Sequence, residues 1–292
     1  MATSLNKALK SKLRKGAGIL VPGASNALMA RIVKASGFDA ATVPGSGVTN
    51  SFLGAPDLGL LTLTELAQHV AAIRENVDLP LVIDADTGFG NALNVRRTVK
   101  VLERAGASAV IVEDQDFPKR NGLFADNPMI TVTAMSDKIK AATDARGDSD
   151  FLIIARSDAI RVTGIGDAVD RANAYIEAGA DLTFIVNPRD RDQMRQIAAL
   201  PAPQVVNIIV GGVTPMLPLA EFQALGFAMV LYANAPLQAA MLAMKEVLDH
   251  LKREGSLDGI SDRLVDFETR QEIVGKAEYD ALERRYNHSE NK

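Results

Sequence analysis

LVIDADTGFG, residues 81–90, joins an apolar run to two acidic residues and a turn bracketed by glycines. Side chains alternate between the two faces of a strand, so Asp84 and Asp86 would point the same way near its carboxyl end. Two carboxylates that close repel each other unless a cation neutralises them, and hard divalent cations prefer such oxygen ligands. The stretch alone leaves two interpretations open: a metal site, or a solvated strand end that caps the next helix.

A repeated pattern runs along the chain, in which a helix end is followed by a glycine and then by a short apolar strand. It occurs at Gly37, Gly106, Gly179 and Gly226. Strands that are apolar almost throughout, and that alternate with helices, predict a parallel sheet covered on both faces. Eight strands are expected, at residues 18–21, 40–43, 80–84, 109–113, 151–155, 182–186, 205–209 and 229–232. Helices are expected at residues 24–36, 64–76, 93–105, 133–146, 166–178, 190–199, 217–225 and 235–254.

This order predicts the α/β class and a (β/α)8 TIM barrel, with a doubly wound sheet as the alternative. No shift in composition suggests a linker, so residues 1–292 are expected to form a single domain. An amphipathic helix at residues 1–15 would precede the barrel, because Leu5, Leu9 and Leu13 repeat at helical spacing. A helical extension at residues 256–292 would follow it, with helices at 260–272 and 278–286.

Composition excludes several classes of protein. The net charge of −4 suggests no nucleic-acid partner, and no apolar run is long enough to span a membrane. The chain has no cysteine, which excludes disulfides and thiolate chemistry, and a cytoplasmic location is expected by default. None of the three histidines falls at a strand end, which excludes a Ser-His-Asp triad. Acid–base chemistry would therefore use carboxylates, Lys, Tyr or bound water.

Polar residues gather at the ends of the expected strands, where a TIM barrel carries its active site. Asp84, Asp86 and Glu113 could hold a cation, and Arg156 could bind a substrate carboxylate with two hydrogen bonds. Ser46, with the amides of residues 45–47, could cradle the same group, and Asn207 and Asn234 follow later strands. The loop at 115–128 is long and polar, which is typical of a lid but also of a flexible excursion.

These residues carry a resemblance to the isocitrate lyase/phosphoenolpyruvate mutase superfamily, and it covers nearly the whole chain. The matching segments are Ser46-Gly47, Pro56-Asp57, residues 84–90, Glu113-Asp114-Gln115, Pro118-Lys119-Arg120, residues 155–159, residues 177–181 and the tail from Phe267 to Tyr286. The resemblance implies a (β/α)8 barrel whose eighth helix is swapped between subunits, in a homo-oligomer built as a dimer of dimers. It also implies a Mg²⁺ enzyme that cleaves or forms a C–C or C–P bond beside a small 2-oxo or 2-hydroxy carboxylate, through a pyruvate-like enolate.

The resemblance also implies roles for individual residues. The metal shell would comprise Asp84, Asp86 and Glu113, with Asp57 further out, and Mg²⁺ is the expected ion with Mn²⁺ as the alternative. Asp84 and Glu113 would act mainly through bound water. The catalytic residues would be Lys119, Asn121, Arg156 and Ser46. The substrate would be bound by Ser46, Gly47, Asp84, Arg156, Asn207 and Leu123.

Several positions depart from the family patterns. Lyases of the family carry Lys-Arg-Cys-Gly-His in the lid, where this chain has Lys119-Arg120-Asn121-Gly122-Leu123, so the lyase acid is absent. Lys119, Asn121 and Leu123 fit the mutase pattern, but Gln115 replaces its lysine and Gly122 its serine. Pro44 stands where an aromatic residue is usual, Val186 where lyases have Glu, and Ala235 where mutases have His.

The function therefore stays open among related reactions. One is C–P rearrangement or cleavage of the phosphoenolpyruvate/phosphonopyruvate type, and another is decarboxylation of an oxaloacetate-like acid, because CO₂ leaves without needing a proton. The alternatives are a C–C lyase of the methylisocitrate or dimethylmalate type, and a catalytically impaired barrel that only binds a ligand. The expected partners are a small carboxylate substrate and further copies of the chain, with no nucleic acid and no membrane.

Overall fold

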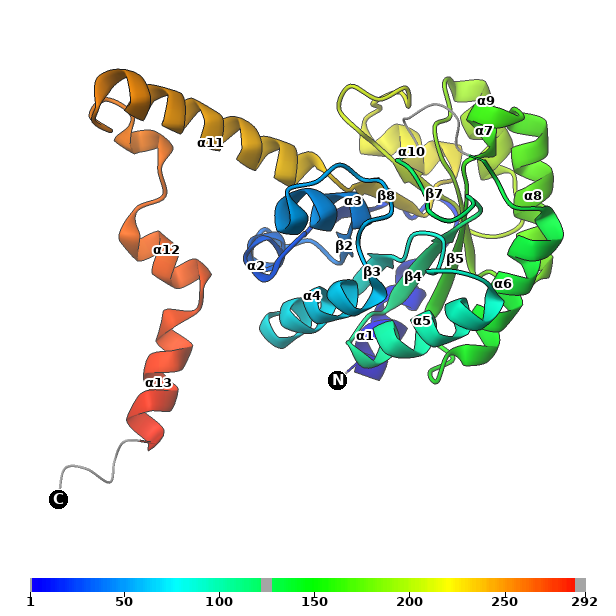
Figure 1. Cartoon of the computed structure of the whole chain (residues 1–292), viewed down its shortest axis with the longest axis horizontal. Helices are drawn as coiled ribbons and strands as arrows, with labels where there is room; N and C mark the ends of the chain where they lie inside the picture. Colours follow the sequence, from blue (N-terminus) through cyan, green and yellow to red (C-terminus); the bar gives the residue numbers. More distant parts are fainter. Residues whose placement is uncertain (1, 122–127, 287–292) are drawn as a thin grey trace. The chain divides into compact units, whose positions relative to one another are not determined.

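The computed structural model describes residues 2–121 and 128–286. The eight expected strands are all present within two residues of their expected bounds. They are β1 (Ile19–Pro22), β2 (Ala41–Val43), β3 (Leu81–Asp84), β4 (Ala109–Glu113), β5 (Leu152–Ser157), β6 (Leu182–Ile185), β7 (Val205–Asn207) and β8 (Met229–Tyr232). Figure 1 shows helices following these strands around the outside of the barrel.

The strands pair in parallel and close into a barrel, which confirms the predicted fold class. A five-stranded sheet runs in the order β2-β3-β4-β5-β6, and a three-stranded sheet in the order β1-β8-β7. The two sheets join at single bridges, Gly23 to Thr42 on one side and Thr183 to Gln204 on the other. The doubly wound alternative is excluded, because β1 pairs with β8 along its whole length.

The helices also follow the expected order. The longer helices are α1 (Ala2–Lys12), α2 (Ala27–Ala35), α4 (Leu63–Asn76), α5 (Ala92–Arg104), α6 (Val132–Ala145), α8 (Ile165–Glu177), α9 (Arg191–Ala198), α10 (Leu219–Leu225) and α11 (Ala235–Glu254). Three short segments were not expected: α3 (Gly45–Val48), the π-helical turn η1 (Thr49–Leu53) and α7 (Ala159–Val162). Each occupies a connection at the carboxyl ends of the strands and is too short for a periodic sequence signal.

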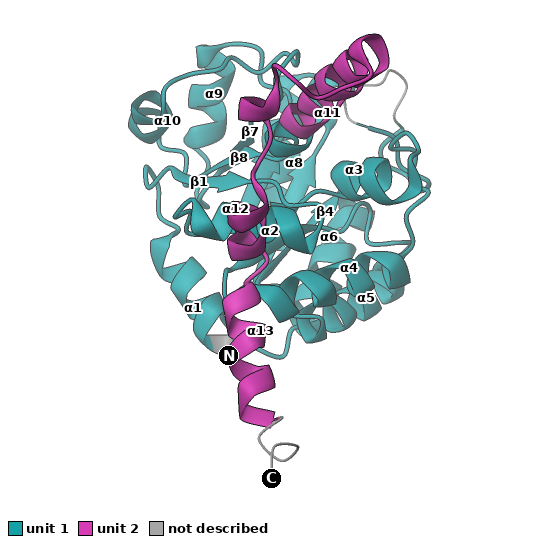
Figure 2. Ribbon diagram, turned by 90° about the vertical axis from the view of Figure 1, so that its left-hand side faces the viewer, with its two compact units in different colours: residues 1–237 teal, residues 238–292 magenta. Residues whose placement is uncertain are grey.

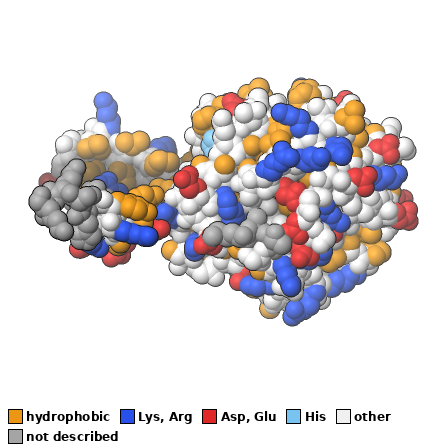
Figure 3. All heavy atoms as spheres, turned by 90° about the horizontal axis from the view of Figure 1, so that it is seen from below, with side chains coloured by type: hydrophobic (Ala, Val, Ile, Leu, Met, Phe, Trp, Pro, Cys, Tyr) orange, Lys and Arg blue, Asp and Glu red, His pale blue; other side chains and the backbone are white. Residues whose placement is uncertain are grey.

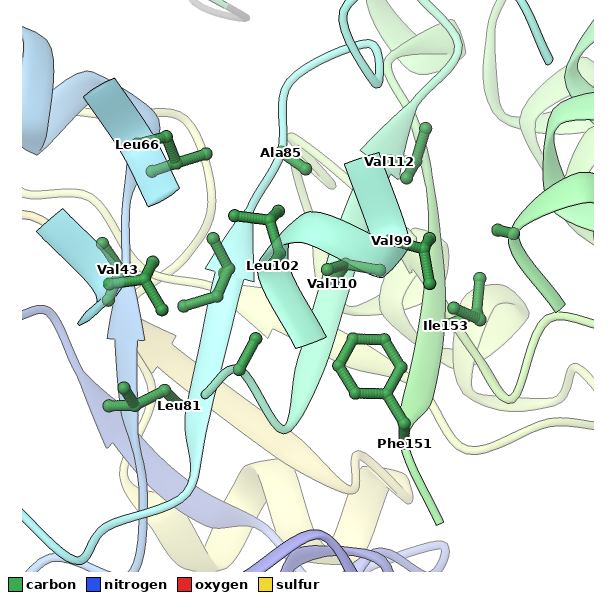
Figure 4. Packing of buried hydrophobic residues seen from close by; sticks show 14 of the residues in the cluster. Val43, Leu66, Leu81, Ala85, Val99, Leu102, Val110, Val112, Phe151 and Ile153 are labelled. Atoms are coloured by element: carbon green, nitrogen blue, oxygen red, sulfur yellow. The ribbon is translucent and has the colours of Figure 1, made fainter. Parts of the chain in front are cut away.

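The barrel lumen is filled by alternate residues of the strands. Val82, Ile111, Ile154 and Phe184 belong to one buried cluster there, and Leu9 of α1 is buried in the same cluster. The opposite faces of β2 to β5 pack against the helices instead, where Val99 and Leu102 of α5 are fully buried. Figure 4 shows these two side chains beside Val110 of β4 and Ile153 of β5. Strand alternation therefore decides which side chains reach the lumen and its mouth.

The chain forms two compact units, residues 1–237 and residues 238–292, which Figure 2 shows in separate colours. The expectation of one domain over the whole chain stays a prediction. In the second unit, the helix expected at 260–272 is broken into a 3₁₀ turn η2 (Ser261–Arg263) and α12 (Phe267–Ile273), before α13 (Lys276–Tyr286). The break arises because Leu264 is extended and Asp266 caps α12, its carboxylate accepting the Thr269 N–H at 2.7 Å.

No helix in the described parts of the chain is long and apolar enough to cross a membrane. On the face of the molecule in Figure 3, basic and acidic side chains are intermingled over the barrel. This mixture fits the modest net charge of −4 and gives no single-sign surface on that face for a polyanion.

Closure of the barrel predicts a sensitive glycine. A Cβ on Gly23 would stand 1.7 Å from the Ala233 carbonyl oxygen, so β1 and β8 could not keep their spacing. We expect Gly23→Ala to lower the free energy of unfolding by about 1–3 kcal/mol in urea titrations, the usual cost of overpacking. Gly166→Ala in α8 is the control, because nothing lies within 4 Å of its Cβ. Equal unfolding midpoints for the two variants would contradict the prediction.

Candidate active site

Charged side chains stand at the mouth of the barrel because they continue the lumen-facing series of the strands. Two residues beyond the lumen residues Val82, Ile111 and Ile154, on the same strand faces, stand Asp84, Glu113 and Arg156. Parallel pairing places Glu113 directly opposite Arg156 on the neighbouring strand. The register of β3, β4 and β5 therefore brings together three of the residues expected in the site.

Asp86 reaches the same place by a different route from the one expected. The strand β3 ends at Asp84, and Asp86 has a φ of 49°, the left-handed region that costs a non-glycine residue about 1 kcal/mol or more. The turn is held because the Glu113 N–H donates to the Asp86 carbonyl at 2.9 Å and the buried Lys138 ammonium donates to Thr87 at 2.9 Å. The Asp86 N–H also donates to the Asp84 carboxylate at 3.2 Å. The two acids meet through this turn, not through strand alternation.

A buried lysine lies among the acids. The Lys119 ammonium is 2.7 Å from Asp57 Oδ1 and 2.9 Å from Asp86 Oδ1, and its side chain is only 3% exposed. Burial by itself would lower the pKa of Lys119, but the carboxylates around it, Asp86 foremost, raise that pKa well above its ordinary value. Lys119 is therefore a fixed positive charge beside the acid cluster.

The acids retain unused capacity for a cation. Apart from the ion pairs of Glu113 with Arg156 and of Asp86 with Lys119, the buried oxygens of Glu113 and Oδ1 of Asp86 accept no well-directed hydrogen bond from the described residues. Burial raises the pKa of Asp86 to about 6, and it raises the pKa of Glu113 well above its ordinary value. Such carboxylates gain from a divalent cation, so the residues fit the expected metal. Within residues 2–121 and 128–286, no three His, Asp or Glu side chains converge as direct ligands of one ion.

Arg156 is held tightly by carboxylates of the protein. Its Nε and Nη2 donate to the two oxygens of Asp158 at 2.9 and 3.0 Å, and its Nη1 lies 2.9 Å from Glu113 Oε2. Nη1 is also 4.0 Å from Asp84 Oδ2, and the guanidinium carbon lies over the Phe184 ring, 5.8 Å from the ring centroid. The guanidinium lines the cavity described below in a fixed orientation, which is what recognition of a substrate carboxylate requires.

The segment after β2 comes close to the acids because it is built of small residues. A Cβ on Gly45 would stand 2.7 Å from Asp86 Oδ1, and one on Gly47 would stand 2.4 Å from Ser25 Oγ. Between them, Ser46 Oγ lies 3.3 Å from Asn234 Nδ2, which donates to it. The Asn234 amide from the end of β8 thus orients the hydroxyl expected to bind substrate.

Asp57 serves the loop after β4 rather than touching the other acids. Besides the Lys119 ion pair, its carbonyl accepts the Asn121 N–H at 3.0 Å and its Oδ2 accepts the Asn121 side-chain amide at 3.2 Å. This geometry pins the start of the loop over the mouth of the barrel. The substrate contact expected of Leu123 lies outside the described residues.

One cavity is lined by some of these groups, whereas Gly47, Asp86, Glu113 and Lys119 are not among its described lining residues. Its described lining residues are Thr42, Pro44, Ser46, Asp57, Asp84, Ile111, Asn121, Arg156, Phe184, Val186, Asn187, Asn207, Ile209, Leu231, Ala233 and Asn234. Asn207 lies at its far side, with its amide oxygen 3.5 Å from the Ala233 N–H. The roles of the expected site residues stay predictions, although the structure brings Ser46, Asp57, Asp84, Asn121, Arg156 and Asn207 to this one cavity.

Sequence reasoning assigned no role to Asp158, Asn187 or Asn234. Asp158 could have been found from its i+2 spacing to Arg156, which favours contact on one face of a strand. Asn187, two residues after the end of β6, adopts a φ of 63°, and asparagine is among the residues that tolerate this region. Its sequence signal, an Asn-Pro pair after an apolar run, indicates a turn but not a pocket.

Comparison with known proteins gives consistent matches over the barrel. The family model described as phosphoenolpyruvate phosphomutase matches residues 9–252. The chain is 39% identical to 2,3-dimethylmalate lyase of Eubacterium barkeri over 269 residues, which cover 92% of this chain and 93% of that protein. The structure of oxaloacetate acetylhydrolase with 3,3-difluorooxalacetate is similar at a TM-score of 0.90, with 29% identity and 97% of each chain covered. That of phosphonopyruvate hydrolase with oxalate and Mg²⁺ gives a TM-score of 0.87, with 33% identity, over 96% of this chain and 98% of that chain.

The acid cluster predicts how metal binding responds to mutation and pH. We expect Asp86→Asn to weaken Mg²⁺ binding at least tenfold in calorimetric titrations, and Asp86→Ala to abolish activity. A cation competes with the proton on Asp86, whose pKa burial raises to about 6. Metal affinity of the unaltered protein should therefore fall as the pH drops from 7 to 5, and should fall less in Asp86→Asn.

Asp137→Asn is the matched control, because this acid is exposed on α6 and pairs only with Lys140 among the described residues. Its metal affinity should equal that of the unaltered chain. Unchanged affinity in Asp86→Asn would remove Asp86 from the metal site.

Proposed function

Because this chain belongs to the phosphoenolpyruvate phosphomutase family, and is therefore an enzyme of the isocitrate lyase/phosphoenolpyruvate mutase superfamily, we propose that it decarboxylates a short 2-oxo diacid of the oxaloacetate type. Relatives with this fold act on small carboxylates, and one binds oxalate with Mg²⁺. We propose Mg²⁺ for this chain too, with Mn²⁺ as the alternative.

One observation carries the choice of reaction: the wall of the cavity away from the acids is neutral. Among the described lining residues Arg156 is the only cation, and its nitrogens already face Asp158 and Glu113. The remaining described wall consists of apolar side chains, hydroxyls and neutral amides, including Val186, Asn187 and Asn207. A second carboxylate of the substrate would therefore rest where no ammonium or guanidinium stabilises its charge.

A neutral wall suits a carboxylate that leaves as CO₂. Its charge disappears in the transition state, so a site that does not stabilise the charge lowers the barrier relative to the bound substrate. In the reaction, the C3–C4 bond of the diacid breaks and its electron pair enters the enolate of pyruvate, which later takes a proton at C3 from water. Neither step needs the lid cysteine of the lyases.

The protein's own residues divide the remaining work. The guanidinium of Arg156, the hydroxyl of Ser46 and the amide of Gly47 hold the carboxylate beside the 2-oxo group. A bound Mg²⁺ supplies the positive charge that stabilises the enolate oxygen. Lys119 adds a fixed positive charge at the acid cluster and, with Asn121, keeps the start of the loop over the cavity.

The second candidate is a C–P rearrangement or cleavage of a phosphonopyruvate-type substrate. It is favoured by Lys119 and Asn121, which fit the mutase pattern of the loop and which both contact Asp57. A phosphonate carries more charge than a carboxylate, and the neutral wall provides little to balance it. We therefore rank this candidate below decarboxylation.

A substrate panel tests the proposal. With Mg²⁺ present, we expect pyruvate and CO₂ from oxaloacetate, and no turnover of phosphonopyruvate, 2-methylisocitrate or 2,3-dimethylmalate. Pyruvate release follows the cleavage reactions, and phosphorus NMR follows the rearrangement. Asp86→Ala is the control for decarboxylation by the free metal ion. Turnover of phosphonopyruvate without turnover of oxaloacetate would overturn the choice.

A cation placed on the neutral wall sharpens this test. Asn207→Lys should lower kcat for oxaloacetate about tenfold or more, because an ammonium stabilises the substrate carboxylate but not CO₂. Val162→Lys is the matched control, since Val162 is 52% exposed on α7 and does not line the cavity. Equal rates in the two variants would show that the wall does not set the reaction.

We further propose that the protein is a homo-oligomer, assembled as a dimer of dimers, in which α11 packs against a second copy of the chain. Met241, Met244, Leu248 and Leu251 repeat along one stripe of α11 and are 40% to 61% exposed. An apolar helix stripe of this kind normally packs against another surface. The family resemblance points to a swapped eighth helix as the form of that packing.

Light scattering after gel filtration tests the assembly. The unaltered chain should elute as a tetramer, and Met244→Glu with Leu248→Glu should dissociate it. Lys252→Glu, a polar exposed position on the same helix, should leave it intact. A monomeric unaltered chain would contradict the proposal.

A further inference from the structure

Asp114 follows Glu113 directly, yet its side chain serves a different purpose. It is fully buried and is absent from the described lining of the cavity. Its Oδ1 accepts the backbone N–H of Asp158 at 3.0 Å, and its Oδ2 accepts the hydroxyls of Ser157 and Tyr175 at 2.8 Å each. A buried carboxylate needs such donors, and two of these come from the segment directly after Arg156.

This contact is linked to the substrate-facing guanidinium. Asp158, whose N–H donates to Asp114, also accepts hydrogen bonds from Arg156 with both of its carboxylate oxygens. The backbone also connects the pair, because the Asp114 N–H donates to the Arg156 carbonyl at 3.2 Å. The position of Asp114 therefore fixes the backbone on both sides of Ser157, and with it the direction from which Asp158 approaches Arg156.

Helix α8 supports Asp114 from behind. Tyr175 is fully buried, and Arg171 Nη1 lies 3.5 Å from Asp114 Oδ2 while donating to the Ile130 carbonyl at 3.0 Å. The Ile130 N–H in turn donates to the Asp114 carbonyl at 2.9 Å. The cluster thus connects the end of β4 with α8 and with the segment before α6. Such a connected network of hydrogen bonds is what keeps the residues of a site in a precise orientation.

We infer that Asp114, backed by Tyr175, is a positioning residue that sets the Arg156–Asp158 pair for binding the carboxylate of the substrate. Asp114 touches neither substrate nor metal in this role. The inference goes beyond the proposed reaction, and it rests on the proposed function only in taking Arg156 as the carboxylate-binding group.

Oxalate binding in the presence of Mg²⁺, measured by calorimetry on the full chain, tests the inference. Asp114→Ala should weaken binding about tenfold, because Asp158 loses the acceptor of its N–H. Asp114→Asn keeps an acceptor oxygen at that N–H and should recover affinity to within about threefold of the unaltered chain. Tyr175→Phe removes one hydroxyl only and should weaken binding by a smaller factor, which keeps the test open if Asp114→Ala does not fold.

A double variant separates positioning from general stability. If Asp114 acts through Asp158, Asp114→Ala in an Asp158→Asn background should cause no further loss beyond about twofold. Thr183→Val is the matched control, because it removes an equally buried hydrogen bond, to Gln204 at 2.8 Å, outside the cavity. It should lower the melting temperature without changing oxalate affinity.

The outcomes are distinguishable. If the unaltered chain binds no oxalate with Mg²⁺, the proposed function fails. If the unaltered chain binds oxalate but a folded Asp114→Ala binds it equally well, the inference on Asp114 is overturned. It is also overturned if the affinity losses of Asp114→Ala and Asp158→Asn add up in the double variant.

Discussion

Glu113 and Arg156 face each other across two neighbouring parallel strands, with 2.9 Å between a carboxylate oxygen and Nη1. Burying either charge alone would cost several kcal/mol, so each depends on the other and on further partners. Arg156 finds its additional partner in Asp158, whereas the Glu113 oxygens accept no well-directed hydrogen bond from the described residues besides this ion pair. The remaining demand for positive charge at Glu113 explains why Lys119 lies near and why a divalent cation suits the site.

Much of the fold could be predicted from the sequence because its signals are local. A glycine that ends a helix, followed by a short apolar run, marks each of several β/α units, and strand alternation then places Asp84, Glu113 and Arg156 at one mouth. The prediction that strand alternation would bring Asp86 beside Asp84 was wrong, because tertiary contacts override the local pattern there. Asp86 leaves the strand for a left-handed turn that Lys138 stabilises from α6, and no short-range signal reports that contact.

Other parts of the site could not be read from the sequence for related reasons. The bond between Asn121 and Asp57 joins residues 64 positions apart, and that between Ser46 and Asn234 joins residues 188 positions apart. Such pairs exist only once the barrel is closed. In the tail, the capping of α12 by Asp266 competed with continuation of the expected helix, and the local hydrogen bond to Thr269 decided the outcome.

The barrel wall is made of two sheets that meet at single bridges, and the polar groups of the cavity are divided between them. The ionisable residues that end described strands, namely Asp84, Glu113 and Arg156, belong to the five-stranded sheet. Asn207 belongs to the three-stranded sheet, and Asn234 follows its strand β8 by two residues. A substitution of the amides on the side of the smaller sheet would therefore leave the ion pairs of the larger sheet in place. The group that the cavity accepts on this side and the charged groups on the opposite side can thus vary independently of each other.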